Sequence, residues 1–256
     1  MIKDIARIVE FLIKYPKSFY YLNLWGRKEI NKRSLTIHAD KKGTDKGFRT
    51  HLYTRIYDDL LTSRRYNIEN FLEIGLLCHI DQQKIGGSRF TKVPSLDMWA
   101  DFFKFANVYG FDIQDFSDAC GNWTQIFQGD QSKREDLKKV VNESQKFDII
   151  IDDALHASRH QQISFSYLFQ YLNKGGLFII EDLNYQPPFE QGQEEIKTIN
   201  CLEVLAKYGE WISPHAFKDE KKWIETYVKS VTFYDSMANG INGVNALAVV
   251  EKTSEL

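Results

Sequence analysis

Residues 147–183 constrain the fold of this chain more than any other stretch. They contain two short apolar runs rich in isoleucine, at 147–151 and 177–180. Continuous apolar runs of this length are typical of strands that are covered on both faces. Between them, residues 161–172 carry apolar side chains at helical spacing. A strand, a helix and a second strand with short connections predict a βαβ unit, in which the two strands are parallel neighbours.

Acidic residues follow both of these strands. Asp153 comes after the first, and Glu181 and Asp182 come after the second. Parallel neighbours lie about 4.8 Å apart, so we expect the three carboxylates to converge at the edge of the sheet where open α/β folds bind ligands. Carboxylates this close repel one another unless a positive charge lies among them, and a hard divalent cation with oxygen ligands is the simplest such charge. His156 then lies beside the metal as the candidate base.

The rest of the chain alternates strand and helix patterns. Further strands are predicted at 71–74, 108–113, 123–127, 230–234 and 246–250, and helices at about 50–61, 96–105 (with Ser95 as N-cap), 134–144 and 194–208. Five alternating strands and a late pair predict an α/β fold, a doubly wound sheet of seven strands with the last one antiparallel. A nicotinamide-binding Rossmann domain is the alternative. However, no G-x-G-x-x-G follows the first strand, since the next glycines after Gly75 are Gly86 and Gly87.

The first three predicted strands also end in acidic or glycine residues. Glu73 and Gly75 end the first, Asp112 ends the second, and Asp130 follows the third. An acid in the position of Asp112 commonly holds ribose hydroxyls. One such acid is uninformative because aspartate favours turns, but three at successive strand ends favour a nucleoside ligand.

Composition indicates an ordinary globular chain of 256 residues, 43% hydrophobic and 27% charged. We expect one domain at 43–256 preceded by a basic, helical extension at 1–42, because residues 1–49 hold twelve Lys/Arg against five Asp/Glu. The formal net charge of −2 gives no indication of a nucleic-acid partner, and none is expected. Three scattered cysteines favour a reducing, cytoplasmic location.

The N-terminal extension begins with an apolar stripe at residues 5–13, surrounded by basic side chains. We expect this stripe to pack on the body of the protein or on a second subunit. The second arrangement corresponds to a homo-oligomer, which is the state we expect. The alternative is peripheral contact with an anionic membrane surface, at the inner face of the membrane. No apolar run approaches the ~20 residues that a membrane span needs.

Several segments together resemble a known family. GTDKG, FLEIG, SLDMW, VYGFDI, GDQS, IIDDALH and IIEDL are similar to the S-adenosylmethionine-dependent sugar O-methyltransferases of the macrocin and mycinamicin type, over about residues 43–190. The resemblance implies a Rossmann-like class I methyltransferase sheet, with S-adenosylmethionine as cofactor and Mg²⁺ as metal. It implies Asp153, Glu181 and Asp182 as metal ligands and His156, with Asp153, as the catalytic residues. The implied cofactor-binding residues are Glu73, Gly75, Asp112, Asp130, Gln131, Thr44, Lys46 and Tyr53.

This resemblance implies methyl transfer to a sugar hydroxyl, either on a glycosylated natural product or in a polysaccharide. An enzyme that methylates a catechol-like phenol is an alternative, because that acceptor also chelates Mg²⁺. A nucleoside-binding module without catalysis is an alternative of another class. His156 and the three acids argue against it. His160, one turn after His156, is a second candidate polar group at the site.

Overall fold

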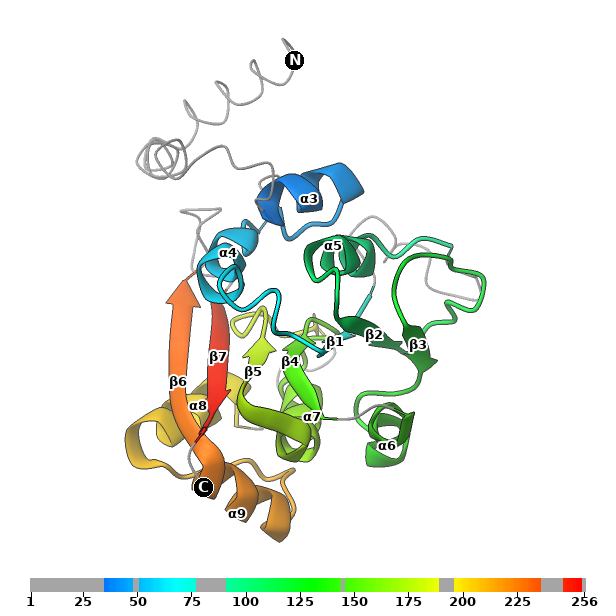
Figure 1. Cartoon of the computed structure of the whole chain (residues 1–256). Coiled ribbons are helices and arrows are strands. Elements are labelled where there is room, and N and C mark those ends of the chain that lie inside the picture. The colour runs from blue at the N-terminus through cyan, green and yellow to red at the C-terminus, as the bar shows by residue number, and fades with distance from the viewer. Residues whose placement is uncertain are drawn as a thin grey trace.

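The structure is a computed structural model of the chain, and it describes residues 35–47, 51–76, 91–143, 146–188, 196–235 and 246–254. Its centre is a seven-stranded sheet in the order β3-β2-β1-β4-β5-β7-β6 (Figure 1). The strands are β1 (Asn70–Ile74), β2 (Asn107–Asp112), β3 (Gln125–Gln128), β4 (Phe147–Asp152), β5 (Leu172–Ile180), β6 (Val228–Asp235) and β7 (Ala246–Lys252). β7 is antiparallel to β5 and β6, and the other pairs are parallel. The predicted sheet is therefore confirmed.

Helices cover both faces of this sheet (Figure 1). One face carries α3 (Leu35–Lys42), α4 (Thr54–Leu61) and α5 (Pro94–Phe102). The other carries α6 (Arg134–Glu143), α7 (Ser158–Leu168), α8 (Thr198–Tyr208) and α9 (Lys218–Tyr227). Two separate apolar cores result, one on each side of the strands.

The packing of β4 explains why its isoleucine run does not alternate with polar residues. Ile149 and Ile151 pack into the core beneath α4 and α5, whereas Phe147 and Ile150 pack into the core beneath α7. All four side chains are completely buried. From Ile149 to Ile151 successive side chains point to opposite faces, so this part of the strand, with helices on both sides, is apolar at every position. Asp148, near the start of β4, is half-buried and accepts hydrogen bonds from the amides of Glu69 and Asn70.

The order of the strands reverses between β1 and β4. The chain proceeds outward from β1 to β2 and β3 on one side, and from β4 to β5 on the other. In register, Ile74 lies beside Asp152, and Asp152 lies beside Ile180. The carboxyl ends of the three central strands therefore meet at the switch point, which is where open α/β sheets bind their ligands.

Four predicted helix starts differ from the structure. α7 begins at Ser158 rather than at residue 161, and α8 begins at Thr198 rather than at residue 194. The helix expected from about residue 50 begins at Thr54, because Leu52 has a φ of 57°, in the left-handed region that a right-handed helix excludes. The helix expected after an N-cap at Ser95 begins at Pro94. Proline suits the first helical position because its φ is fixed near the helical value, and the Ser95 side chain instead bonds Glu73.

The boundary between α7 and β5 also differs from the prediction. α7 ends at Leu168, a short 3-10 turn (Phe169–Tyr171) follows, and β5 starts at Leu172 rather than near residue 177. The glycines at 175 and 176, expected before the strand, lie within it. The helix α9 was not predicted, because its sequence is mostly charged. It is anchored by the buried Ile224 and by the Arg134–Glu220 ion pair.

Two features of the sequence analysis fall outside the described residues, namely the apolar stripe at 5–13 and the glycines at 86 and 87. The domain boundary after residue 42 stays a prediction. α3, which lies before it, contributes Leu35 and Ala39 to the same core as α5. Among the helices that the structure describes, none has the length and apolar character needed to cross a membrane.

Packing of β4 gives a direct test of the fold. Ile150→Ala should lower the free energy of unfolding by ~2–5 kcal/mol, because truncation leaves a cavity in a fully buried position. Ile113→Ala is the matched control, since Ile113 is 60% exposed and its truncation should change stability by less than ~0.5 kcal/mol. Urea unfolding followed by circular dichroism measures both. Equal effects would contradict the assignment of β4 to the core.

Candidate active site

The chain after β1 lies so close to the chain after β4 that residue 75 must be glycine. Gly75 has a φ of +87°, and a Cβ atom there would lie 2.3 Å from the Asp153 carbonyl oxygen and 2.4 Å from the Ala154 Cα atom. Such distances exclude any side chain. The predicted cofactor residue Gly75 is thus placed directly against the loop that carries Asp153.

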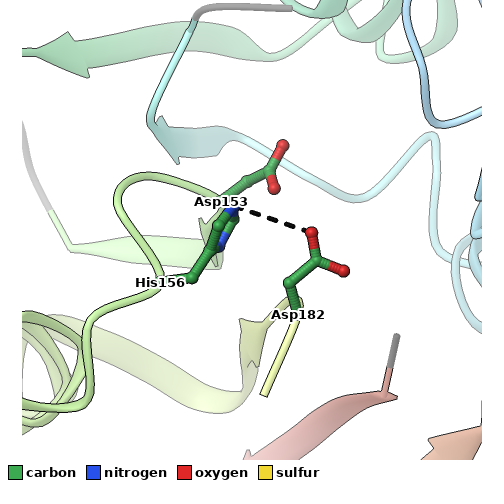
Figure 2. Close-up of side chains that lie close together, drawn as sticks. All are labelled: Asp153, His156 and Asp182. Atoms are coloured by element: carbon green, nitrogen blue, oxygen red, sulfur yellow. Dashed lines mark ion pairs between the residues drawn. The ribbon is translucent and has the colours of Figure 1, made fainter. Parts of the chain in front are cut away.

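Asp153, His156 and Asp182 form one cluster at the ends of β4 and β5 (Figure 2). One side-chain ligand atom from each lies within 4.8 Å of the others, and His156 Nε2 is 3.6 Å from Asp182 Oδ2. The three side chains come from two loops and point toward one another in Figure 2. The sequence predicted Asp153, Glu181 and Asp182 as metal ligands, with His156 beside them as the base. The structure instead groups His156 with Asp153 and Asp182, and Glu181 is not part of this cluster. The roles of these residues stay predictions.

Two members of the cluster have an unusual backbone. His156 has a φ of 61° and Asp182 a φ of 52°. Left-handed conformations of non-glycine residues are uncommon and are retained mainly where the surrounding structure requires them, often at functional sites. Here both such residues belong to the cluster with Asp153.

His156 has few other partners. Its Nδ1 atom is buried without a hydrogen-bond partner among the described residues. The Tyr185 ring packs edge-on to the imidazole, with centroids 5.8 Å apart. His160 lies in α7 and is not part of the Asp153–His156–Asp182 cluster. A role for His160 at the site stays a prediction.

Lys46 supplies a positive charge among the acids. Its side chain is almost completely buried, and its Nζ atom bonds Asp153 and, at 2.9 Å, Glu181 Oε1. Glu73 Oε1 lies 3.5 Å from the same ammonium. In the structure the Lys46 ammonium contacts the acids, and the assignment of Lys46 to the cofactor stays a prediction. Thr44, assigned with it, lies next to this lysine with its hydroxyl 3.5 Å from the Lys46 amide.

Burial and the Lys46 ammonium shift the pKa values of the acids in opposite directions. Burial disfavours the charged form of Asp153, but the Lys46 ammonium and then His156 outweigh it and hold the pKa of Asp153 below its usual range. Burial, followed by the charge of Asp153, raises the pKa of Glu181. Burial also raises the pKa of Glu73 to about 7, although Lys46 opposes it. The region therefore holds more acidic groups than one lysine neutralises.

Two tyrosines complete the contacts with the acids. Tyr53 donates a hydrogen bond to Asp182 Oδ1 at 2.6 Å, and Tyr57 donates one to Glu181 Oε1. Burial, and then the neighbouring carboxylate in each case, raises the pKa of both phenols, so they remain neutral donors. The sequence assigned Tyr53 to the cofactor and missed Tyr57. The spacing of four residues between them was the available signal, since it places both on one side of a helical turn.

Glu73 lies in β1 and is completely buried. Its Oε1 atom accepts a hydrogen bond from Trp99 Nε1 at 3.1 Å, and its Oε2 atom has no partner in the part of the chain that the structure describes. A buried carboxylate oxygen without a donor favours a further partner. This leaves Glu73 suited to a polar group of a ligand.

The remaining cofactor candidates are tied to their own loops. Asp112 accepts hydrogen bonds from the amides of Leu76 and Gln114, both at 2.8 Å, and so fixes the turn after β1. Asp130 Oδ1 accepts from the Ser132 amide at 2.9 Å. These bonds order the two loops at the end of the sheet where the nucleoside was predicted.

Gln131 points inward rather than toward this edge. Its Nε2 atom donates to Asp152 and, at 3.1 Å, to Ser164. Asp152 is completely buried at the end of β4. The side chain of Gln131 therefore connects the loop after β3 to the strand that carries Asp153, and the assignments of Asp112, Asp130 and Gln131 to the cofactor stay predictions.

The strand order and the acids at the switch point define a Rossmann-like class I methyltransferase fold. Solved structures of the MycE methyltransferase from the mycinamycin biosynthetic pathway share it. The complex with Mg, SAH and mycinamycin VI matches with a TM-score of 0.69 at 25% identity, over 97% of this chain and 63% of that one. A complex with Mg and SAH matches with a TM-score of 0.65 at 26% identity, over 87% of this chain and 55% of that one.

Curated proteins similar to this chain are named as O-methyltransferases. The chain is 36% identical over 141 residues to the mycinamicin VI 2''-O-methyltransferase of Micromonospora griseorubida, which covers 54% of this chain and 34% of the relative. It is 32% identical over 161 residues to the demethylmacrocin O-methyltransferase of Streptomyces fradiae, 60% of this chain and 39% of the relative. The predicted resemblance is confirmed. The chain spans between about a third and a half of the length of these relatives. No protein-family model matches it.

The buried lysine makes a testable contribution to stability. Lys46→Met should lower the free energy of unfolding by ~3–5 kcal/mol in the absence of divalent cations, because it leaves buried acids without their positive partner. Lys42→Met is the control, since its ion pair with Asp101 is partly exposed and should contribute ~1 kcal/mol or less. Thermal unfolding in EDTA compares them. A Lys46 variant as stable as the control would contradict the role of Lys46 as counter-ion.

Proposed function

We propose that this protein is an S-adenosylmethionine-dependent O-methyltransferase that acts on a sugar hydroxyl of a glycosylated natural product, with the assistance of a divalent cation. The observation that carries the proposal is the Asp153–His156–Asp182 cluster at the switch point of a class I methyltransferase sheet. The similarity to O-methyltransferases of glycosylated natural products supports the choice of acceptor.

The acids fit a divalent cation in chemistry and in charge. Asp153 and Asp182 present carboxylate oxygens to the same small volume, and oxygen is the ligand that Mg²⁺ prefers. Glu181 precedes Asp182 in the chain, and the hydrogen bonds from Lys46 and Tyr57 both fall on its Oε1 atom. Lys46 brings one positive charge to a region with four carboxyl groups. Asp153, Glu181 and Asp182 would hold the ion, which would supply positive charge next to the acceptor hydroxyl.

His156 is the base in this proposal. A sugar hydroxyl is a weak nucleophile while it keeps its proton, and an imidazole at the site can take that proton. The Nε2 atom faces the acids, and Asp182 places a negative charge 3.6 Å from it, beside the imidazolium that forms. Mg²⁺ prefers oxygen to imidazole nitrogen, so His156 is assigned to proton transfer rather than to the metal.

The other residues hold and orient the methyl donor. The sulfonium of S-adenosylmethionine supplies an activated methyl group. Glu73, with a free carboxylate oxygen, and Gly75 are assigned to its methionyl end, and Asp112 and Asp130 to the nucleoside. Placing the methyl group in line with the acceptor oxygen contributes by proximity.

The alternatives receive less support. A further relative, 34% identical over 159 residues, is named as a 2'-O-methyltransferase of an alpha-L-rhamnosyl tetracenomycin, which favours a sugar over a catechol-like phenol. A nucleoside-binding module without catalysis does not explain a histidine and two acids brought together by strained loops. A glycan acceptor in polysaccharide synthesis, contact with a membrane surface, a cytoplasmic location and a homo-oligomer stay predictions.

Metal dependence is the first test. EDTA should abolish methyl transfer from labelled S-adenosylmethionine to a panel of deoxysugar glycosides, and added Mg²⁺ should restore it, because the acids would hold the charge that the developing alkoxide needs. The assay follows label in the glycoside. Transfer at the full rate in EDTA would remove the metal from the proposal.

The role of His156 can be separated from metal binding. His156→Gln should lower kcat by roughly a hundredfold or more, as expected for loss of a general base, and should leave the affinity for Mn²⁺ unchanged. His215→Gln, a change before α9 in the loop that contacts Arg134, is the control and should keep normal turnover. A large loss of Mn²⁺ affinity in His156→Gln would identify the residue as a ligand instead.

A further inference from the structure

A single segment of the chain supplies hydrogen-bond donors to every acid of the proposed metal site. Lys46, Tyr53 and Tyr57 lie within twelve residues of one another and reach three acids on the loops after β4 and β5. These contacts join residues more than 100 positions apart in the chain. The segment therefore forms a layer of donors behind the acids.

The donors occupy one oxygen of each acid and leave the other. Tyr53 bonds Asp182 Oδ1, whereas Asp182 Oδ2 faces His156. Tyr57 and Lys46 both bond Glu181 Oε1, and Lys46 bonds Asp153 Oδ2. The bonds from Lys46 and Tyr57 thus fall on Glu181 Oε1 and Asp153 Oδ2, and not on Glu181 Oε2 or Asp153 Oδ1. Carboxylates that ligate metals are commonly held in this way, with one oxygen bonded to the protein.

Each tyrosine ring is itself held in place. The Tyr57 ring packs edge-on against Trp99, with centroids 5.3 Å apart, and the Trp99 indole is bonded to Glu73. The Tyr53 ring stacks on the His51 ring, with centroids 5.4 Å apart. Tyr53 follows Leu52, whose φ of 57° turns the chain before α4. The Thr54 amide bonds the Lys46 carbonyl oxygen at 3.1 Å, which closes the loop between the lysine and the helix.

The two kinds of donor have different effects on charge. Lys46 neutralises part of the negative charge that would attract a cation. A tyrosine hydroxyl orients a carboxylate and leaves its charge intact. Neutral donors thus suit a site that must hold several acids together and still attract a divalent ion.

We propose that Tyr53 and Tyr57 are positioning residues of the divalent-cation site, and that each fixes one acid so that its second oxygen is presented to the ion. The proposal rests on the proposed function, in that it requires the acids to bind a metal. It assigns the phenol hydroxyls to the metal site rather than to the methyl donor. Tyr53 thereby acquires a role different from the one that the sequence implied.

The test measures metal binding without turnover. The full-length protein and the variants Tyr53→Phe and Tyr57→Phe are titrated with MnCl₂ alone, and free Mn²⁺ is followed by electron paramagnetic resonance. Each variant should bind Mn²⁺ about tenfold or more weakly, as is typical when an outer partner of a metal ligand is removed. Binding of S-adenosylhomocysteine, measured by calorimetry, should not change.

Tyr109→Phe is the matched control, because Tyr109 is also buried but packs against Phe127 and Phe147 on the opposite face of the sheet. It should bind Mn²⁺ like the unmodified protein. Wild-type affinity for Mn²⁺ in both tyrosine variants would overturn the proposal. If the unmodified protein does not bind Mn²⁺, the metal-dependent function itself fails, which is a distinguishable result.

A second measurement needs no variant. Mg²⁺ added to the unmodified protein should change the near-ultraviolet circular dichroism of tyrosine, because the acids that accept the phenol hydrogen bonds would bind the ion. An unchanged spectrum at saturating Mg²⁺ would count against the proposal even if the phenylalanine variants proved too unstable to study.

Discussion

The buried contact of Lys46 with Asp153 and Glu181 connects parts of the protein that are remote in sequence. The lysine comes from the turn after α3, and the acids follow β4 and β5 at the centre of the sheet. Charged groups lose hydration on burial, and they are tolerated in a protein interior only when they are paired and hydrogen-bonded. The ammonium thus makes an acidic centre compatible with a folded protein, and it ties the α3–α4 segment to the edge of the sheet.

The same edge combines rigid and strained structure. The strands are buried on both faces, so the ends of β4 and β5 are fixed in register with each other. The chain then leaves the strands through His156 and Asp182, both in the left-handed region. Local strain of ~1–3 kcal/mol per residue persists where packing determines the conformation. A rigid sheet can therefore hold an arrangement of three polar side chains that a flexible loop would not maintain.

The comparison with known proteins places the chain among proteins of one fold and points to one chemistry. A shared fold alone would be compatible with many functions. The similarity to sugar O-methyltransferases becomes informative because the acids and the histidine of this chain come together at the switch point. The chain aligns with less than half of each curated relative, so the choice of acceptor is a proposal that experiments on this chain must test.

The sequence by itself determined the central βαβ unit, the seven-stranded sheet and the edge at which the acids gather. These features follow from local patterns, since an apolar run covered on both faces makes a strand and the residue after it lies at the edge. The sequence did not predict that Lys46 would face the acids or that Tyr57 would reach Glu181. Those contacts span 107 to 135 residues, and they exist only because the segment from Lys46 to α4 packs on one particular face of the sheet. Tertiary structure decided them because side-chain direction depends on how the helices pack, which no local spacing specifies.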